Sequence, residues 1–391
     1  MSNKRLQFGI LFFALFIDML GFGIVMPILP RYAECLGATS WQIGLLVGIF
    51  SMAQLFMLPF WGHLSDKIGR KPVLIISMMG TAVGYLIMSM TRSMTIMMIG
   101  RSLDGASGGN MGVIQASVSD ITKPEERSRM MGILGAAYGI GFIFGPALGG
   151  WASHRYGFST PMWMAAGLAG INAILIMIFL PGSTKKKEKA LKQRASLLML
   201  WEHVERKIYI AALLTFFFFV LGFSMIVTLI ALFFYHRYGI NALEIGYIYA
   251  MFGVIAIVLE GGLFGMLAKK WGDRKLAIVG ALLLVTTSFY MPLTASVGAA
   301  VIACAVFAIG DSLLTPSLPS IVSRSAKEEW QGTVFGFYQS AGCLARCFGP
   351  VLAGFFLTIN FQGSHYALAS FWIAAGFLLL SFFFSLRLPR A

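Results

Sequence analysis

Charged residues are scarce in this chain, and their scarcity excludes most kinds of soluble protein. Only 12% of the 391 residues are charged and 58% are hydrophobic, with a mean hydropathy of +0.80. A helix needs ~20 apolar residues to cross a bilayer, and the chain holds many runs of that length. The runs lack residue-by-residue alternation, which excludes a membrane β-barrel. The sequence therefore predicts an all-α membrane protein without a separate soluble domain.

Residue patterns that carry metal binding or catalysis are also missing. The chain has only four cysteines, and they show no ligand spacing. Its five histidines fall in or near expected loops without converging. No phosphate-binding glycine loop of the ATPase type occurs. The sequence thus predicts no metal site, no cofactor, no enzymatic activity and no ATP-driven step.

A short basic loop occurs twice. Residues 62–74 read GHLSDKIGRKPVL, and residues 265–276 read GMLAKKWGDRKL, 203 positions later. A second pair agrees, because Gly145-Pro146 recurs as Gly349-Pro350 with an offset of 204. A repeat of about half the chain length indicates a duplicated helical bundle.

Twelve spans fit the apolar runs, six on each side of a polar stretch. We expect an N-terminal half over 1–181, a basic linker over 182–207 and a C-terminal half over 208–391. Parallel repeats of this kind place a substrate site near the midplane between the halves. The predicted spans cover 8–29, 41–61, 72–91, 95–117, 129–150, 161–181, 208–230, 244–265, 276–295, 299–321, 332–356 and 367–386.

The net charge of +14 is explained by membrane topology rather than by nucleic acid. With the N-terminus inside, only four basic residues lie outside and two within spans, which leaves 24 of the 30 Lys and Arg in cytoplasmic segments. This is the positive-inside distribution. It predicts a multi-pass protein of the cell (inner) membrane with both termini in the cytoplasm, no nucleic-acid partner, and contact of the linker with lipid headgroups.

Three motifs together carry a family resemblance. The first loop contributes Gly62, Asp66, Gly69, Arg70 and Lys71, and span five contributes Gly141, Gly145, Pro146, Gly149 and Gly150. Arg101-x-x-x-Gly105 in span four is the third. The chain resembles the major facilitator superfamily, and its first span (DMLGFGIVMPILP, 18–30) resembles that of twelve-helix drug:proton antiporters such as tetracycline and quinolone exporters. The resemblance implies twelve helices in two six-helix halves.

The loop motif is expected to act as a latch on the cytoplasmic side. The resemblance implies that Asp66 faces the N-terminus of span eleven near Gly332, and that Arg70 pairs with Asp120 at the end of span four. In the second copy Lys269 replaces the aspartate and Asp273 replaces the arginine, so only the first half is expected to hold the full latch. The alternative interpretation is that these charges only anchor the membrane topology of the chain.

The span-five motif places small residues at four-residue spacing, so two helix backbones can approach closely. Pro146 removes one backbone hydrogen bond and bends the helix. The line of close contact between the two helices, called the seam, either serves packing only or also seals the substrate cavity against leak. Gly349-Pro350 repeats part of this motif, beside Arg346 and Phe348.

Ionisable residues inside spans are costly, so they are candidates for proton coupling or substrate binding. Asp18 can carry a proton, because removal from water disfavours its charged form; contact with a cationic substrate and a purely structural role are the alternatives. Arg101 and Asp104 can pair on one helix face, and the pair is either coupled to protons or merely neutralised. In the second half, Arg346 pairs with one of two acids, receives an anion, or only packs or snorkels; these acids are Glu260 and Asp311.

Together these features predict a secondary transporter that works by alternating access. Its expected activity is proton-coupled efflux of small amphipathic or drug-like compounds by a monomer, driven by the proton gradient. Export of an endogenous metabolite (siderophore, lipid, sugar or organic anion) is the alternative, and a non-transporting membrane sensor or scaffold is the remote one. Five polar side chains within spans are candidates to line the cavity: Gln54, Gln115, Tyr138, Tyr338 and Gln339.

Overall fold

The computed structural model describes residues 2–108, 110–122, 124–181, 205–325, 331–357 and 366–389. Its described elements are all helices, without a strand among them. This is the expected outcome for long apolar runs, because a helix satisfies every backbone polar group within the segment. Most of the predicted linker, residues 182–204, lies outside the described part of the chain.

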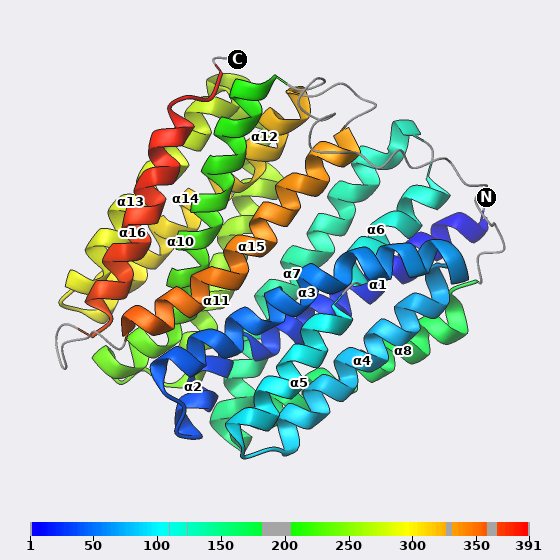
Figure 1. Cartoon of the computed structure of the whole chain (residues 1–391), viewed down its shortest axis with the longest axis horizontal. Helices are drawn as coiled ribbons and strands as arrows, with labels where there is room; N and C mark the ends of the chain where they lie inside the picture. Colours follow the sequence, from blue (N-terminus) through cyan, green and yellow to red (C-terminus); the bar gives the residue numbers. More distant parts are fainter. Residues whose placement is uncertain are drawn as a thin grey trace. The chain divides into compact units, whose positions relative to one another are not determined.

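The helices of the first half follow the predicted spans closely (Figure 1). One short helix, α2, extends the first span after a turn that precedes Pro30. The bounds are α1 Ser2–Val25, α2 Leu29–Cys35, α3 Ser40–Ile68, α4 Arg70–Met90, α5 Met94–Ser107, α6 Asn110–Ile121, α7 Pro124–Tyr156 and α8 Thr160–Phe179.

The second half repeats the pattern, with one π-helical segment in its second span. That segment, η1, separates α11 from α12. The bounds are α10 Arg206–Tyr238, α11 Ala242–Ala256, η1 Ile257–Leu263, α12 Phe264–Trp271, α13 Asp273–Tyr290, η2 Met291–Leu293 (a 3₁₀ turn), α14 Val297–Arg324, α15 Gln331–Leu357 and α16 Leu368–Ser385.

Within the described residues, 11 helical stretches are long and apolar enough to cross a membrane. The one expected span missing from these is the fourth, over 95–117, which is not one continuous helix within the described residues. It consists of α5 and α6, which are interrupted after Ser107 and are each too short to span alone. α5 and α6 together cover the predicted range, and the break lies at Gly108, which leaves helical geometry at ψ 34°.

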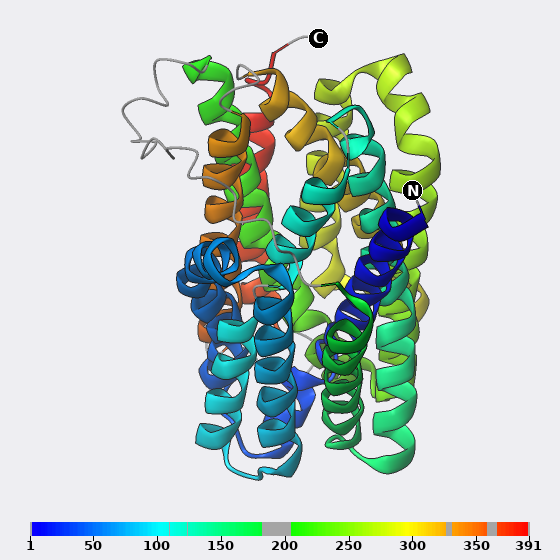
Figure 2. The ribbon, with the colours of Figure 1, turned by 90° about the vertical axis from the view of Figure 1, so that its right-hand side faces the viewer.

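Equivalent helices pack in the same pairs in both halves, as the repeat predicts. In the first half α1 contacts α7 and α8, and α4 contacts α5 and α8. Figure 2 shows α4, α5 and α8 running side by side at the front. In the second half α10 contacts α15 and α16, and α13 contacts α14 and α16. The duplicated sequence thus folds into two bundles of the same design.

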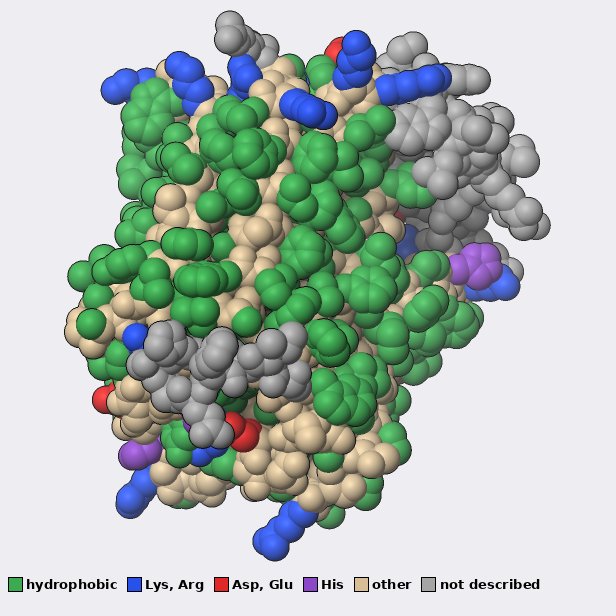
Figure 3. All heavy atoms as spheres, turned by 60° about the vertical axis from the view of Figure 1, so that its left-hand side comes forward, with side chains coloured by type: hydrophobic (Ala, Val, Ile, Leu, Met, Phe, Trp, Pro, Cys, Tyr) green, Lys and Arg blue, Asp and Glu red, His purple; other side chains and the backbone are tan. Residues whose placement is uncertain are grey.

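Apolar side chains cover most of the face shown in Figure 3, the side that carries α13 and α16. Lys and Arg side chains gather mainly at its upper edge. An apolar exterior with charges at its edge is typical of a protein surrounded by lipid.

The chain divides into two compact units, and each consists of most of one half plus a short piece of the other. Unit 1 comprises Met1–Thr39, Ile49–Glu188 and Ile240–Gly253. Unit 2 comprises Ser40–Gly48, Lys189–Gly239 and Val254–Ala391. The predicted halves are therefore joined by two exchanged helix ends, one from α3 and one from α11.

Glycines explain both exchanges. In unit 1 the backbones of α7 and α11 touch, since a Cβ on Gly150 would lie 3.2 Å from the Cα of Gly246. In unit 2 those of α15 and α3 touch, since a Cβ on Gly354 would lie 3.0 Å from the Cα of Gly44. The two contacts are related by the internal repeat, because Gly150 and Gly354 are 204 residues apart and Gly44 and Gly246 are 202 apart.

Candidate functional site

The glycines of span five hold α7 tightly against α1. A Cβ on Gly141 would lie 2.8 Å from Met19 Cβ, and one on Gly145 would lie 2.8 Å from the Cα of Gly23. Gly149 faces the backbone carbonyl of Ile24 in the same way. Since Asp18 precedes Met19 on α1, this close seam fixes the depth and rotation of the helix that carries the acid.

Span four is interrupted where three side chains hydrogen-bond to its freed carbonyl groups. Trp61 Nε1 donates to Ala106 O at 2.6 Å, and Gln54 Nε2 donates to Gly108 O at 2.8 Å. Ser77 Oγ donates to the carbonyl of Ser107 between them. Backbone groups inside a membrane need partners, so these donors stabilise the break. The sequence signal for the break was the pair of adjacent glycines at 108 and 109.

Another glycine contact packs α5 closely against α4. A Cβ on Gly84 would lie 2.8 Å from the carbonyl oxygen of Gly100 and 3.1 Å from Asp104 Cβ. No larger residue fits there without moving a backbone. The contact brings Tyr85, next to Gly84, level with Arg101 and Asp104.

Arg101 and Asp104 form a fully buried ion pair. The Nη1–Oδ2 distance is 2.6 Å, and the two side chains are 1% and 3% exposed. The guanidinium also lies 4.3 Å from the ring centroid of Phe50 and 5.6 Å from that of Phe22. Because a buried charge is expensive unless paired, each partner depends on the other. The predicted pairing on one helix face is present in the structure.

Tyr85 connects this pair to Asp18. Its side chain is 3% exposed, and its hydroxyl interacts electrostatically with Asp104, Arg101 and Asp18. Asp18 itself is half-buried on α1. Three of the predicted charged residues, one on α1 and two on α5, therefore act electrostatically on one tyrosine of α4. We call Asp18, Tyr85, Arg101 and Asp104 the acid cluster.

Tyr85 was absent from the predicted site. A tyrosine within an apolar span is an ordinary core residue by sequence alone. The packing of α4 against α5 was needed to place it beside the charged pair.

The two acids of the second half are also neighbours. Glu260 lies in η1 and interacts electrostatically with Asp311 of α14 and with the hydroxyl of Ser312. Asp311 Oδ1 accepts a hydrogen bond from Thr315 Oγ1 at 2.9 Å. A π-helical turn is rare, and it is frequent at functional sites because it re-aims a side chain. Here it carries Glu260.

Arg346 forms no ion pair with the acids that the structure describes. Its Nη2 approaches Cys343 Sγ at 3.5 Å, and its charge acts on Tyr338. Of the predicted alternatives, pairing with Asp311 or Glu260 is not seen in this structure. Of the remaining alternatives, contact with an anion is taken up below.

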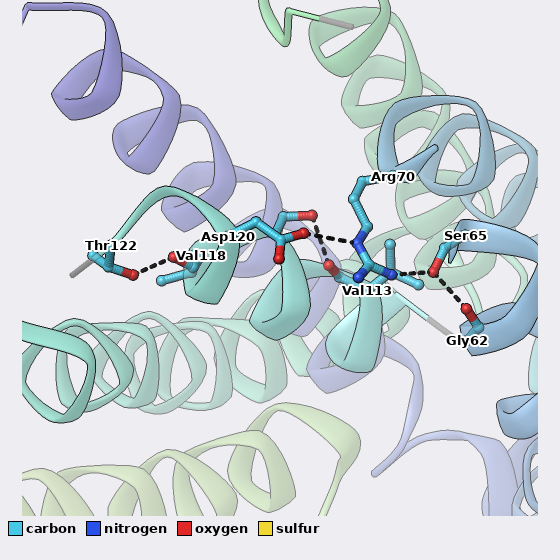
Figure 4. A network of polar contacts seen from close by, with 8 residues as sticks. Gly62, Ser65, Arg70, Val113, Val118, Asp120 and Thr122 are labelled. Atoms are coloured by element: carbon cyan, nitrogen blue, oxygen red, sulfur yellow. Dashed lines mark hydrogen bonds and ion pairs between the residues drawn. The ribbon is translucent and has the colours of Figure 1, made fainter. Parts of the chain in front are cut away.

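The first loop motif forms the predicted bond across its helix ends. Arg70 Nε donates to Asp120 Oδ2 at 3.2 Å, and Arg70 Nη1 donates to Ser65 Oγ. Figure 4 shows the guanidinium between these two partners, with Ser65 bonded in turn to Gly62. Lys71 is half-buried. The side chain of Asp66 and the surroundings of Gly332 lie outside the described part, so the expected contact between these residues stays a prediction.

The second loop carries the same bond with reversed charges. Asp273 is 4% exposed, and its Oδ2 accepts hydrogen bonds from Ser320 Oγ at 2.6 Å and from Arg324. Asp273 follows Arg70 by 203 residues, and Arg324 follows Asp120 by 204. The repeat thus preserves the position of the pair and inverts its sign. The sequence prediction missed Arg324. Adding the repeat offset of 204 residues to Asp120 would have identified it.

Helix dipoles distinguish the two pairs. Asp273 begins α13 and Arg324 ends α14, so both charges complement the dipoles of their helices. Arg70 begins α4 and Asp120 lies one residue before the end of α6, so both charges oppose theirs. Each charge is worth about 0.3–1 kcal/mol in this position. The second pair is therefore the more stable connection, and the first is the easier one to break.

Exchanging the residues within each pair is expected to have opposite effects. Arg70→Asp with Asp120→Arg keeps the pair and aligns it with the dipoles, so the thermal stability of the purified protein should rise. Asp273→Arg with Arg324→Asp places both charges against the dipoles, and stability should fall by about 1–2 kcal/mol. Thermal unfolding in detergent measures both. Equal shifts in the same direction would contradict the dipole argument.

The predicted cavity-lining residues are placed differently from one another. Gln54 and Gln115 are half-buried, Gln339 is exposed and Tyr338 is 1% exposed. The side chain of Tyr138 lies outside the described part. Gln54 is bonded to the break in span four, and Tyr338 stacks on Phe216 with ring centroids 3.8 Å apart. Within the described residues, no group of three metal-ligating side chains occurs.

Two bundles of one design, each with charged groups inside its membrane-spanning helices, define a secondary membrane transporter. The chain belongs to the Major Facilitator Superfamily, whose family model matches residues 11–350. Its fold is the twelve-helix fold of that superfamily, with the fourth span divided into α5 and α6.

Curated relatives are similar over nearly their whole length. Multidrug resistance protein 2 of Bacillus subtilis (strain 168) is 29% identical over 388 residues, which cover 97% of this chain and 94% of that protein. Tetracycline resistance protein, class B, of Escherichia coli is 27% identical over 346 residues, with 86% and 84% covered.

Among solved structures, the human organic anion transporter MFSD10 (TETRAN) matches with a TM-score of 0.72 and 25% identity, covering 98% of this chain and 99% of that one. A bacterial homologue of the human lysosomal transporter Spinster, in an inward-facing conformation, matches with a TM-score of 0.81 over 98% and 97%. At 14% identity that second likeness concerns the fold alone.

Proposed function

We propose that this transporter exports small amphipathic or drug-like compounds in exchange for protons, by alternating access. The acid cluster carries the proposal. The Arg101–Asp104 pair neutralises itself, so protonation of Asp18 changes the net charge of the cluster by one unit. A membrane-embedded acid beside a neutralised pair is suited to bind and release a proton. The names of the relatives, multidrug and tetracycline resistance proteins, support efflux of such compounds.

In the proposed cycle, a proton that enters from outside binds Asp18 and favours release of the substrate. Tyr85 lies in the field of both this carboxylate and the pair, and the close contact of α1 with α7 would make the two helices move together. The protein would act as a monomer in the cell (inner) membrane with both termini in the cytoplasm. It would need no cofactor and no catalytic residue, because the proton gradient drives the transport.

Substrate-induced proton release tests the proposal. Addition of a lipophilic cation such as tetraphenylphosphonium to weakly buffered, purified protein should release protons. Asp18→Asn should reduce this release at least tenfold, because its side chain cannot ionise. The control is Glu244→Gln, an exposed acid at the start of α11, which should behave as the original protein. Release that is unchanged in Asp18→Asn would overturn the assignment of the proton to Asp18.

Export of an organic anion is the second candidate function. Arg346 favours it, because its positive charge has no acidic partner among the described residues. The similarity to a human protein described as an organic anion transporter also supports it. In the same assay, a response to anions alone would favour this candidate.

A further inference from the structure

Arg346 is half-buried in the middle of a membrane span, where its side chain cannot extend to the membrane surface. It stands 12 residues after Val334 and 11 before Leu357, the ends of its span. At 1.5 Å per residue, the two ends are about 17–18 Å away. A guanidinium near a helix end can place its charge at the membrane surface, but one at this depth cannot. Its charge must therefore meet a protein group, a ligand or the water of a cavity.

The protein itself supplies little compensation. Within the described residues, the polar groups recorded beside Arg346 are the Cys343 sulfur at 3.5 Å and the side chain of Tyr338, both neutral. The acids of the same unit interact with other groups, Asp311 with Thr315 and Glu260 with Asp311 and Ser312. Arg101 provides the contrast, since it has both a carboxylate and two aromatic rings.

Tyr338 presents a second unsatisfied polar group. Its residue is 1% exposed, yet its hydroxyl has no hydrogen-bond partner within the described residues. A buried hydroxyl without a partner is destabilising, so such a group calls for an explanation. Its ring is fixed, because it stacks on Phe216 at 3.8 Å and 16°. A hydroxyl held so firmly beside a guanidinium is preorganised to donate to the same acceptor.

Gly342 makes room for this arrangement. A Cβ at that position would lie 2.6 Å from Phe216 Cε1 and 3.5 Å from Arg346 Nη1. The Phe216 ring and the Arg346 guanidinium therefore both lie over the bare backbone of one residue. An apolar ring and a cation thus stand next to each other on one face of α15.

Aromatic rings continue from this point along α10. The ring centroids of Phe216 and Phe219 lie 6.5 Å apart, and those of Phe219 and Phe223 lie 5.6 Å apart. The ring of Phe223 in turn stacks on that of Phe307, with centroids 5.6 Å apart. This row gives an apolar, ring-lined environment next to the cation. Phe216, Phe219 and Phe307 are 8%, 3% and 0% exposed, so the row is packed, and an aromatic body suits its edge next to the cation.

We propose that the second half binds an aromatic carboxylate, with the carboxylate held by the Arg346 guanidinium and the Tyr338 hydroxyl and the aromatic body on the Phe216 row. A planar carboxylate matches the fork of a guanidinium, and a hydroxyl can donate to the same oxygens. One cation and one hydroxyl suit a single negative charge. This inference rests on the second candidate function, export of an organic anion, and it names the substrate class.

Direct binding tests the inference separately from proton coupling. The probes are 2-naphthoate, 2-naphthamide and 2-naphthylmethylammonium, which share one aromatic body and carry a negative, a neutral and a positive group. Calorimetric titration of the purified full chain should give naphthoate at least tenfold tighter binding than naphthamide. Arg346→Gln should reduce that ratio to about one, and Tyr338→Phe should reduce it three- to tenfold, because one donor to the carboxylate is lost.

Two further variants make the result unambiguous. Arg155→Gln, at an exposed position on α7, removes one positive charge elsewhere and should keep the ratio. Glu244→Gln should also keep it, and because calorimetry records binding without proton coupling, a failure of proton coupling would not be mistaken for a failure of this site. Tyr338→Phe preserves the ring stack, which guards against a result caused by misfolding. The inference is overturned if naphthamide or the ammonium compound binds as tightly as naphthoate, or if Arg346→Gln retains the preference.

Discussion

Replacing Gly149 by alanine is expected to destabilise the protein by about 2–3 kcal/mol, although the change adds a single methyl group. That methyl group would fall well within 3.0 Å of the Ile24 carbonyl on α1, where no side chain can move aside. Overpacking typically costs about 1–3 kcal/mol, and a clash with backbone lies at the upper end. Thermal unfolding of the detergent-purified protein measures the loss.

Gly135→Ala on the same helix is the matched control. A Cβ there meets nothing within 4 Å, so alanine only improves helix propensity. Its stability should be unchanged or slightly raised. If the two variants lose stability equally, close contact of α1 and α7 is not what the glycine provides.

The Gly149→Ala variant should also reduce transport. Gly149 and its neighbours set the position of α1, and α1 carries Asp18. A displacement of α1 moves this carboxylate away from Tyr85. We therefore expect substrate-induced proton release to fall in Gly149→Ala and to remain in Gly135→Ala.

Removing Arg101 alone is expected to be more damaging than removing the whole ion pair. Arg101→Leu leaves the 3%-exposed carboxylate of Asp104 without its partner, at a cost of about 3–5 kcal/mol. Arg101→Leu with Asp104→Leu removes both charges among apolar neighbours, including the rings of Phe22 and Phe50. Most of the lost stability should return, because an apolar replacement of a buried pair is often neutral.

Transport distinguishes the two readings of this pair. If the pair assists proton coupling, the stable double variant should still lack substrate-induced proton release. If the double variant releases protons normally, the pair is only a neutralised structural element. A double variant as unstable as Arg101→Leu would instead show that the polar contacts of the pair are required for packing.

The two loops show how a duplicated scaffold diverges. Both keep a charge pair at the same place in the repeat, but only the second pair agrees with its helix dipoles. A connection that must open during alternating access benefits from being weak. A connection within a rigid bundle benefits from being strong. The sign reversal therefore fits the expectation that the first loop carries the moving latch.

Several parts of the site were predictable from the sequence. The Arg101–Asp104 pair follows from i,i+3 spacing, and the Arg70–Asp120 bond follows from the family resemblance. Other parts were not predictable. The break in span four depends on Trp61, Gln54 and Ser77, which reach its carbonyl groups from two other helices. Periodicity within one helix contains no information about donors on another.

The sequence by itself determined the membrane fold, the duplication and the helices that carry charge. It could do so because hydrophobicity, repeat spacing and the cost of charges in lipid are properties of segments. Only the tertiary structure decided which charges meet. It placed Tyr85 between Asp18 and the Arg101–Asp104 pair, gave Asp273 its partner Arg324, and left Arg346 beside a tyrosine instead of an acid. Those outcomes depend on glycine contacts that set the depth and rotation of each helix against its neighbours.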